Sequence, residues 1–183
     1  MTTVFLDRDG VINADSPDYI KSWAEFDFIP GSREAISRLT RAGISVIVIT
    51  NQSAINRGMV ALAELMAMHR RMCQAVAQSG GRIRDIFFCP HRPEEYCTCR
   101  KPKPGMILAA RDRHGIDLAS SVMVGDSAKD IRAGRAAGCG GTILVQTGNG
   151  RRAIQTLEAS NLPPDHVAAD LDQAVEWIFA QKR

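Results

Sequence analysis

One segment limits the possible folds of this chain more than any other: residues Ser45–Thr50, with the sequence SVIVIT. Its β-branched apolar residues follow one another without polar alternation, as expected for a strand that is buried on both faces of a sheet. Strands of this kind belong to parallel sheets whose two faces are covered by helices. The segment therefore predicts an α/β fold.

Other short apolar segments alternate along the chain with helical ones. The further predicted strands are Val4–Asp7, Asp85–Cys89, Ser121–Val124, Thr142–Val145 and an edge strand at His166–Ala168. The predicted helices are Ser32–Ala42, Ala61–Gln78, Gly105–His114, Ala128–Ala137 and Leu171–Gln181. This alternation predicts βαβ units and a parallel sheet flanked by helices. The length of 183 residues fits a single domain, residues 1–183.

Charge and hydropathy exclude several classes of partner. The formal net charge is +3, from 23 basic and 20 acidic residues, which is too small to favour nucleic acid or an anionic membrane. No apolar segment approaches the roughly 18 residues that a membrane span needs. The first predicted strand begins almost at once and leaves no room for a signal peptide. We therefore expect a cytoplasmic protein that binds neither nucleic acid nor a membrane.

Polar side chains lie at the ends of three of the predicted strands. The first strand ends at Asp7, with Asp9 two residues further on, the second ends at Thr50, followed by Asn51, Gln52 and Ser53, and the fourth ends in Gly125 and Asp126. The carboxyl ends of parallel strands meet at one edge of the sheet, where ligands bind. Lys101, in the loop after the third strand, could reach the same edge. The sequence thus predicts one site with carboxylates, a hydroxyl and an ammonium group.

These groups suit phosphoryl transfer. A carboxylate such as Asp7 can attack phosphorus and form an aspartyl phosphate. Asp9 is placed to give a proton to the leaving oxygen and later to take one from water. Mg²⁺ prefers oxygen ligands, here Asp7, Asp126 and the carbonyl of Asp9. Thr50 and Lys101 would hold the other phosphoryl oxygens. Each motif alone also fits a turn or a helix N-cap, but their order at three strand ends favours catalysis.

With these motifs, the chain resembles the haloacid dehalogenase (HAD) superfamily of phosphotransferases. The motifs that carry the resemblance are Asp7–Val11, Thr50, Lys101 and Gly125–Asp130, within a stretch from residue 4 to 145. The resemblance implies a Rossmann-like fold, Asp7 as the nucleophile, Asp9 as the general acid and base, and Mg²⁺ held by Asp7, Asp126 and the carbonyl of Asp9. Asp130 is an alternative carboxylate near the metal.

A second group of residues has the character of a metal site. Its members are Cys89, His91, Cys97 and Cys99, which offer three thiolates and an imidazole. Four such ligands suit a tetrahedral, structural Zn²⁺ site. Free thiols with a disulfide are the alternative, which a reducing cytosol disfavours. The spacing predicts a zinc loop over residues 89–104 that positions Arg100 and Lys101.

Within the superfamily, the zinc loop resembles two families of phosphatases. One removes the 7-phosphate of D-glycero-D-manno-heptose 1,7-bisphosphate, in the synthesis of lipopolysaccharide core precursors, and the other hydrolyses histidinol phosphate. Arg100–Met106, with the sequence RKPKPGM, is more similar to the heptose family. The loop is shorter than in some heptose phosphatases and in this respect resembles the histidinol family. The heptose bisphosphate is the predicted substrate, and histidinol phosphate is the alternative.

The resemblance also implies an enzyme without a cap domain, since Asn13–Phe28 is too short to form one. Loops must then bind the small phosphorylated metabolite. The candidate residues are Asp15, Ser16, Pro17, Asp18, Asn51, Gln52, Ser53, Arg100 and Lys101. Arg100 could clamp a second phosphate with two hydrogen bonds, or it could pair with a surface carboxylate. We expect a monomer.

Two further classes are less consistent with the sequence. A zinc-stabilised binding module that lost its chemistry has no reason to keep Asp7, Asp9, Lys101 and Asp126 together. A phosphatase that repairs nucleic-acid ends would use the same motifs. Such a protein needs a basic surface with interleaved aromatic residues, and aromatic residues make up only 5% of this chain.

Overall fold

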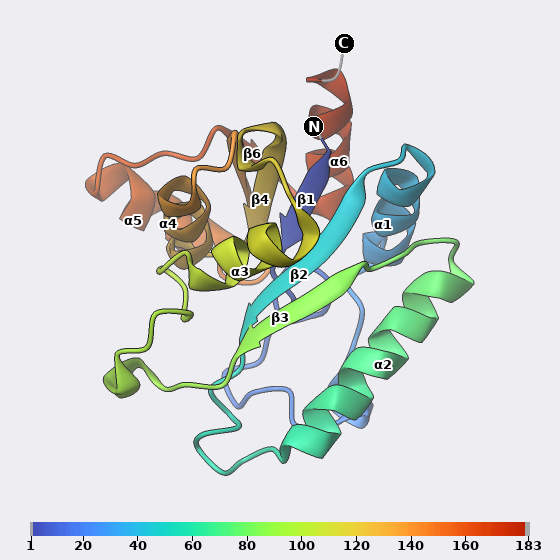
Figure 1. Ribbon diagram of the computed structural model, residues 1–183, viewed down its shortest axis with the longest axis vertical. Coiled ribbons are helices and arrows are strands. Elements are labelled where there is room, and N and C mark those ends of the chain that lie inside the picture. The colour runs from blue at the N-terminus through green and yellow to red at the C-terminus, as the bar shows by residue number, and fades with distance from the viewer. Residues whose placement is uncertain (1, 182–183) are drawn as a thin grey trace.

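In the computed structural model, which describes residues 2–181, six parallel strands form one sheet in the order β3-β2-β1-β4-β5-β6 (Figure 1). The strands are β1 (Thr3–Leu6), β2 (Ser45–Asn51), β3 (Asp85–Cys89), β4 (Ser121–Gly125), β5 (Gly141–Val145) and β6 (His166–Ala168). The helices are α1 (Ser32–Arg41), α2 (Leu62–Gln78), α3 (Gly105–His114), α4 (Ala128–Ala137), α5 (Gly150–Ala159) and α6 (Leu171–Ala180). The predicted α/β fold is confirmed, and β6 is an edge strand as expected.

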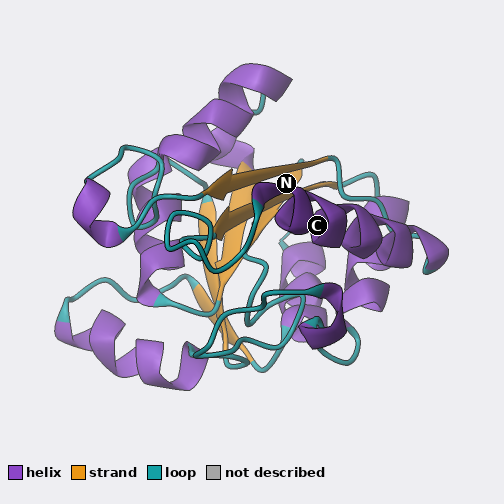
Figure 2. Ribbon diagram, turned by 90° about the horizontal axis from the view of Figure 1, so that it is seen from below, coloured by secondary structure: helices purple, strands orange, loops and turns teal. Residues whose placement is uncertain are grey.

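Successive residues of the central strands point to opposite faces of the sheet. Even-numbered residues such as Val4, Val46 and Val122 pack in one core with α1, α2 and α6. Odd-numbered residues such as Phe5 and Ile47 pack in a second core with α3 and α4. Figure 2 shows the sheet between these two helical layers. Burial on both faces explains why β2 contains no polar alternation.

The path of the chain explains where the site forms. After β1, the strand β2 is added on one side of β1 and β3 beside β2. The chain then crosses back, and β4 pairs with β1 on its other side. The strand order therefore reverses at β1, which makes its carboxyl end a topological switch point. Ligands of open parallel sheets bind in the crevice at such a point. The residue that follows β1 is Asp7.

The sequence did not predict α5. Only Ala153, Ile154 and Leu157 provide its apolar stripe, which is short for a helix that the pattern alone could identify. The stripe packs against Leu144 of β5 and against α4. Packing on the sheet therefore stabilises a helix that its own sequence signals weakly.

Between β1 and α1, the chain forms a loop with one 3-10 turn, η1 (Trp23–Glu25). Its aromatic rings pack together: Trp23 stacks on Phe26 with ring centroids 4.9 Å apart, and Phe28 meets Phe26 edge-on at 5.1 Å. Over the described part of the chain, this segment has no helix or strand of a cap domain, as the sequence predicted. Nor is any helix among residues 2–181 long and apolar enough to cross a membrane.

Candidate active site

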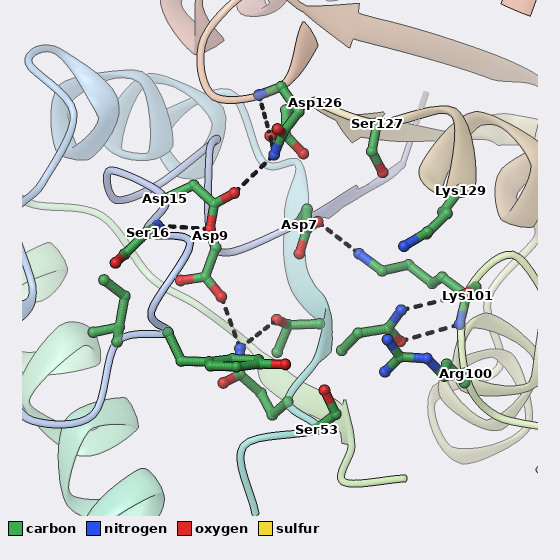
Figure 3. A pocket seen from close by; sticks show the side chains of 16 residues that line it. Asp7, Asp9, Asp15, Ser16, Ser53, Arg100, Lys101, Asp126, Ser127 and Lys129 are labelled. Carbon is green, nitrogen blue, oxygen red and sulfur yellow. Dashed lines mark hydrogen bonds and ion pairs between the residues drawn. The ribbon is translucent and has the colours of Figure 1, made fainter. Parts of the chain in front are cut away.

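The carboxyl ends of β1, β2 and β4 border a cleft of about 220 Å³. Asp7, Asp9, Thr50, Lys101 and Asp126 all line it, as expected from their places at strand ends and in the loop after the third predicted strand. Figure 3 shows Asp7 in the middle of this cleft, with Lys101 on one side and Asp9 and Asp126 on others. The sheet therefore brings together residues that are up to 119 positions apart, from Asp7 to Asp126.

Lys101 joins the carboxylates at the floor of the cleft. Its ammonium nitrogen lies 2.8 Å from Asp7 Oδ2 and 2.6 Å from Asp130 Oδ1, and it donates a hydrogen bond to the carbonyl of Ile49 at 2.8 Å. The side chain is only 3% exposed. Burial alone would lower the pKa of Lys101, but the charges of Asp130 and Asp7 outweigh it and raise that pKa. Lys101 is therefore a fixed positive charge beside Asp7.

Three carboxylates, two that line the cleft and one buried beneath it, can hold a cation. One oxygen from each of Asp7, Asp126 and Asp130 lies within 4.8 Å of the others. Burial raises the pKa of Asp7 well above its ordinary value; the charge of Lys101 opposes this shift and those of Asp130 and Asp126 add to it. Burial, followed by the charge of Asp130, raises the pKa of Asp126 to about 7. A divalent cation with oxygen ligands would relieve this repulsion, so the residues fit Mg²⁺.

Asp9 has a different environment, rich in hydrogen-bond donors. The buried guanidinium of Arg8 binds it through Nε and Nη2, at 2.7 to 3.0 Å. Asn13 donates to it at 2.9 Å and Gln52 at 2.8 Å. Burial would raise the pKa of Asp9, but Arg8 and the other donors outweigh it and lower that pKa. Asp9 is therefore held here as an ionised acceptor.

The end of β2 and the residues after it connect the parts of the site. The amide nitrogen of Asn51 donates to the carbonyl of Lys101, and its amide oxygen accepts from the N–H of Lys101, both at 3.1 Å. This pair fixes the backbone of Lys101 against β2. Gln52 donates to Thr50 Oγ1 at 2.9 Å as well as to Asp9. Ser53 lines the cleft beside them (Figure 3).

The predicted substrate residues divide into two groups. Asp15, Ser16 and Arg100 line the cleft together with Asn51, Gln52 and Ser53. Among the described residues, Pro17 and Asp18 are not part of that lining: Pro17 borders a neighbouring hollow, and Asp18 is exposed. The backbone N–H of Asp18 donates to Ser16 Oγ at 3.2 Å, a local bond within the loop, and the loop reaches the cleft again at Tyr19 and Ile20.

Further residues line the cleft that sequence reasoning did not select. They are Tyr19, Ile20, Ser127, Lys129 and Asn149. Ser127 and Lys129 belong to the recognised motif Gly125–Asp130, so their position could have been inferred. Tyr19 has a positive φ of 62° and Asn149 follows β5. Neither of these two has a signal in the sequence that points to the cleft.

The predicted zinc ligands converge at one point beside the cleft. Cys99 Sγ lies 3.3 Å from both Cys89 Sγ and His91 Nδ1, and 3.5 Å from Cys97 Sγ. Cys89 Sγ lies 3.6 Å from Cys97 Sγ and 3.5 Å from His91 Nδ1. Zn–S bonds of about 2.3 Å in a tetrahedron separate the sulfurs by about 3.8 Å. The four ligand atoms are thus arranged at nearly the spacing that tetrahedral zinc requires.

Comparisons with known proteins agree with this geometry. Residues 98–174 match the model of the HAD-hydrolase-like family, a match that includes Lys101, Asp126 and Asp130. The fold and the site therefore define a HAD-like hydrolase. The D-glycero-beta-D-manno-heptose-1,7-bisphosphate 7-phosphatase of Bordetella bronchiseptica is 45% identical over 182 residues, 99% of each chain. The enzyme of the same name from Pseudomonas aeruginosa is 49% identical over 167 residues, 91% of this chain and 93% of its own.

Solved structures extend the similarity to three dimensions. The D,D-heptose 1,7-bisphosphate phosphatase of B. bronchiseptica, in complex with magnesium and phosphate, superimposes with a TM-score of 0.92 at 44% identity, over 99% of both chains. The corresponding structure from Burkholderia thailandensis gives a TM-score of 0.73 at 39% identity, over 98% of this chain and 99% of its own. This chain belongs to the family of the D-glycero-D-manno-heptose-1,7-bisphosphate 7-phosphatases.

Proposed function

We propose that the protein is a magnesium-dependent phosphatase that removes the 7-phosphate of D-glycero-D-manno-heptose 1,7-bisphosphate through an aspartyl phosphate. The observation that carries the proposal is Asp7, which follows β1 at the switch point of the sheet and lies 2.8 Å from Lys101. The relatives named above are all heptose bisphosphate phosphatases. They support this substrate and give no support to histidinol phosphate, the alternative.

In the first step, a carboxylate oxygen of Asp7 attacks the phosphorus of the 7-phosphate. The bond between this phosphorus and the sugar oxygen on C7 breaks. The leaving sugar oxygen takes a proton from Asp9. Lys101 and the hydroxyl of Thr50 bind the phosphoryl oxygens while charge moves onto the leaving oxygen. Magnesium held by Asp7, Asp126 and the carbonyl of Asp9 would neutralise the repulsion between the attacking carboxylate and the phosphate.

In the second step, water attacks the aspartyl phosphate, Asp9 takes the proton of that water, and inorganic phosphate and free Asp7 are formed. The ion pair with Arg8 keeps the carboxyl group of Asp9 ionised, which is the form that can act as the base. To serve as the acid of the first step, its carboxylate must first leave that ion pair and be protonated.

A structural Zn²⁺ at Cys89, His91, Cys97 and Cys99 would support the loop of residues 89–104. The four protein ligands would leave no open coordination position. This loop delivers Arg100 to the cleft, where we propose that its guanidinium clamps the second phosphate of the substrate. Asp15, Ser16, Asn51, Gln52 and Ser53 are the proposed sugar contacts.

We further propose that residues 1–183 act as one domain and as a monomer. A cytoplasmic location is consistent with the metal site, since its thiols must stay reduced to bind zinc. Light scattering of the purified protein tests the monomer, and a stable dimer would contradict it.

Phosphate release from heptose 1,7-bisphosphate, histidinol phosphate and fructose 1,6-bisphosphate, with Mg²⁺ and with EDTA, tests the function. We expect turnover of the heptose substrate, loss of turnover in EDTA, and a product that keeps its phosphate at C1 by ³¹P NMR. Equal slow rates on all three compounds would overturn the substrate. Asp7→Asn should abolish turnover, whereas Asp112→Asn, at an exposed position of α3, should leave it unchanged. An active Asp7→Asn variant would overturn the mechanism.

A further inference from the structure

Asn149 immediately precedes α5, where an asparagine side chain ordinarily accepts a hydrogen bond from the first turn of the helix. Here the side chain makes no such capping bond. Its amide nitrogen instead donates to Asp15 Oδ2 at 2.7 Å and to Asp126 Oδ2 at 3.3 Å. The backbone N–H of the same residue donates to Asp126 Oδ2 at 2.8 Å. Helix capping therefore does not account for this side chain.

Both donors of Asn149 bind the same oxygen of Asp126. Two glycines enclose that oxygen as well: a Cβ atom added to Gly10 or Gly148 would lie only 2.1 or 2.2 Å from Asp126 Oδ2. Thr147 holds one of these glycines in place, since its hydroxyl donates to the carbonyl of Gly10 at 2.6 Å. The carboxylate is thus fixed through Oδ2, and Oδ1 is the oxygen left for a cation.

The same amide connects two loops that are distant in the sequence. Asp15 lies in the loop after β1 and Asn149 in the loop after β5, 134 positions further along the chain. Figure 3 shows Asp15 beside Asp126 at the rim of the cleft. One side chain therefore bridges a proposed substrate contact and a proposed metal ligand.

We propose that Asn149 is a positioning residue for the reaction: it fixes the carboxylate of Asp126 for Mg²⁺ and ties the loop of Asp15 to it. The inference rests on the proposed magnesium site. Hydrogen bonds to a metal ligand set its orientation, and their removal typically lowers metal affinity about 10-fold to 100-fold. The N-terminal end of α5 adds the favourable end of its helix dipole beside the same carboxylate.

Isothermal titration of Mg²⁺ into the purified protein, without substrate, tests the proposal. Asn149→Ala removes both side-chain bonds and keeps the backbone donor, so we expect the Kd for Mg²⁺ to rise about 10-fold, the lower end of the usual range. Asn56→Ala is the matched control: it removes an amide–carboxylate bond of 2.8 Å, to Glu95, outside the carboxylate cluster. We expect wild-type affinity for this control. A wild-type Kd in folded Asn149→Ala would overturn the proposal.

A second variant keeps the test decisive if Asn149→Ala does not fold. Asn149→Ser retains a good residue for the start of a helix, but its side chain is too short to bridge two carboxylates. It should weaken Mg²⁺ binding in the same way, and raising the Mg²⁺ concentration should restore its turnover. A wild-type Kd for Mg²⁺ in folded Asn149→Ser would overturn the proposal. The magnesium titration requires no substrate, so it remains informative even if the proposed substrate is wrong.

Discussion

Lys101 and Asp130 form a buried ion pair beneath the cleft, with Lys101 Nζ 2.6 Å from Asp130 Oδ1 and the two side chains 3% and 0% exposed. The other carboxylate oxygen of Asp130 accepts hydrogen bonds from the backbone N–H and the hydroxyl of Ser127, at 3.0 and 2.6 Å, at the start of α4. One carboxylate therefore holds both the lysine beside Asp7 and the first turn of a helix.

This position predicts a large effect of Asp130→Asn on stability. The amide would leave the buried charge of Lys101 with Asp7 as its remaining carboxylate partner, and loss of a hydrogen bond to a charged group costs about 1.5–3 kcal/mol. Urea unfolding would measure the loss. Asp172→Asn is the control, because the pair of Asp172 with Arg38 is half exposed and should contribute less than about 1 kcal/mol. Equal losses in both variants would contradict the prediction.

Lys101→Met should affect catalysis more than binding of the sugar. The ammonium group would stabilise the phosphoryl oxygens most strongly as charge develops on them, so kcat should fall about 10²-fold to 10³-fold. Lys101→Arg should not restore activity, because a planar guanidinium does not fit the buried position of an ammonium group. Steady-state kinetics in saturating Mg²⁺ measures both. An active Lys101→Arg variant would show that charge alone is sufficient.

The part of the site that the sequence could predict is the part that the sheet fixes. Asp7, Thr50 and Asp126 each lie at the carboxyl end of a strand whose apolar pattern is visible, and the carboxyl ends of parallel strands meet at one edge of the sheet. Asp18 is different, because it lies in an irregular loop whose path no strand or helix pattern in the sequence fixes. Asn149 could not be found either, since its partners are set by tertiary contacts between two loops.

The zinc loop should couple metal content to activity. Lys101 is anchored by Asn51 on one side and follows the metal cluster on the other, so loss of zinc should displace it. We expect Cys97→Ser to lose zinc and to lower kcat/KM about 10-fold or more. Cys73→Ser, on α2, should retain both zinc and activity. Atomic absorption and phosphate release measure the two quantities, and turnover that survives loss of zinc would refute the coupling.

Arg100→Ala should distinguish substrates with one phosphate from those with two. The guanidinium is oriented by a hydrogen bond of 3.0 Å from Nη1 to the carbonyl of His91. Removing a charge-assisted contact to the second phosphate should cost about 1.5–3 kcal/mol, or about 10-fold to 100-fold in kcat/KM for a bisphosphate. The effect on a sugar monophosphate should be smaller. Arg111→Ala, an exposed position of α3, is the control, and equal losses on both substrates would exclude the clamp.

His69 should make the protein less stable in acid. Burial, followed by the charge of Arg8, lowers the pKa of His69 to about 3, with Asp9 opposing the shift, and its Nε2 lies 3.4 Å from Arg8 Nη1. An unfolded histidine has a pKa of about 6.5, so below this pH the unfolded chain takes up a proton that the folded protein does not. Above about pH 6.5, His69 is neutral in both states and its titration does not lower the free energy of unfolding. Below this pH, the free energy of unfolding falls by about 1.4 kcal/mol per pH unit, down to about pH 3.

His69→Gln removes this titrating group and isolates its contribution. The stability difference between wild type and variant should shift by about 2 kcal/mol, against the wild type, between pH 7.5 and pH 5.0. Urea unfolding of both proteins at the two pH values measures this shift, and the titrations of all other groups that the two proteins share cancel in the comparison. A stability difference that stays constant with pH would show that His69 takes up a proton in the folded protein as readily as in the unfolded chain.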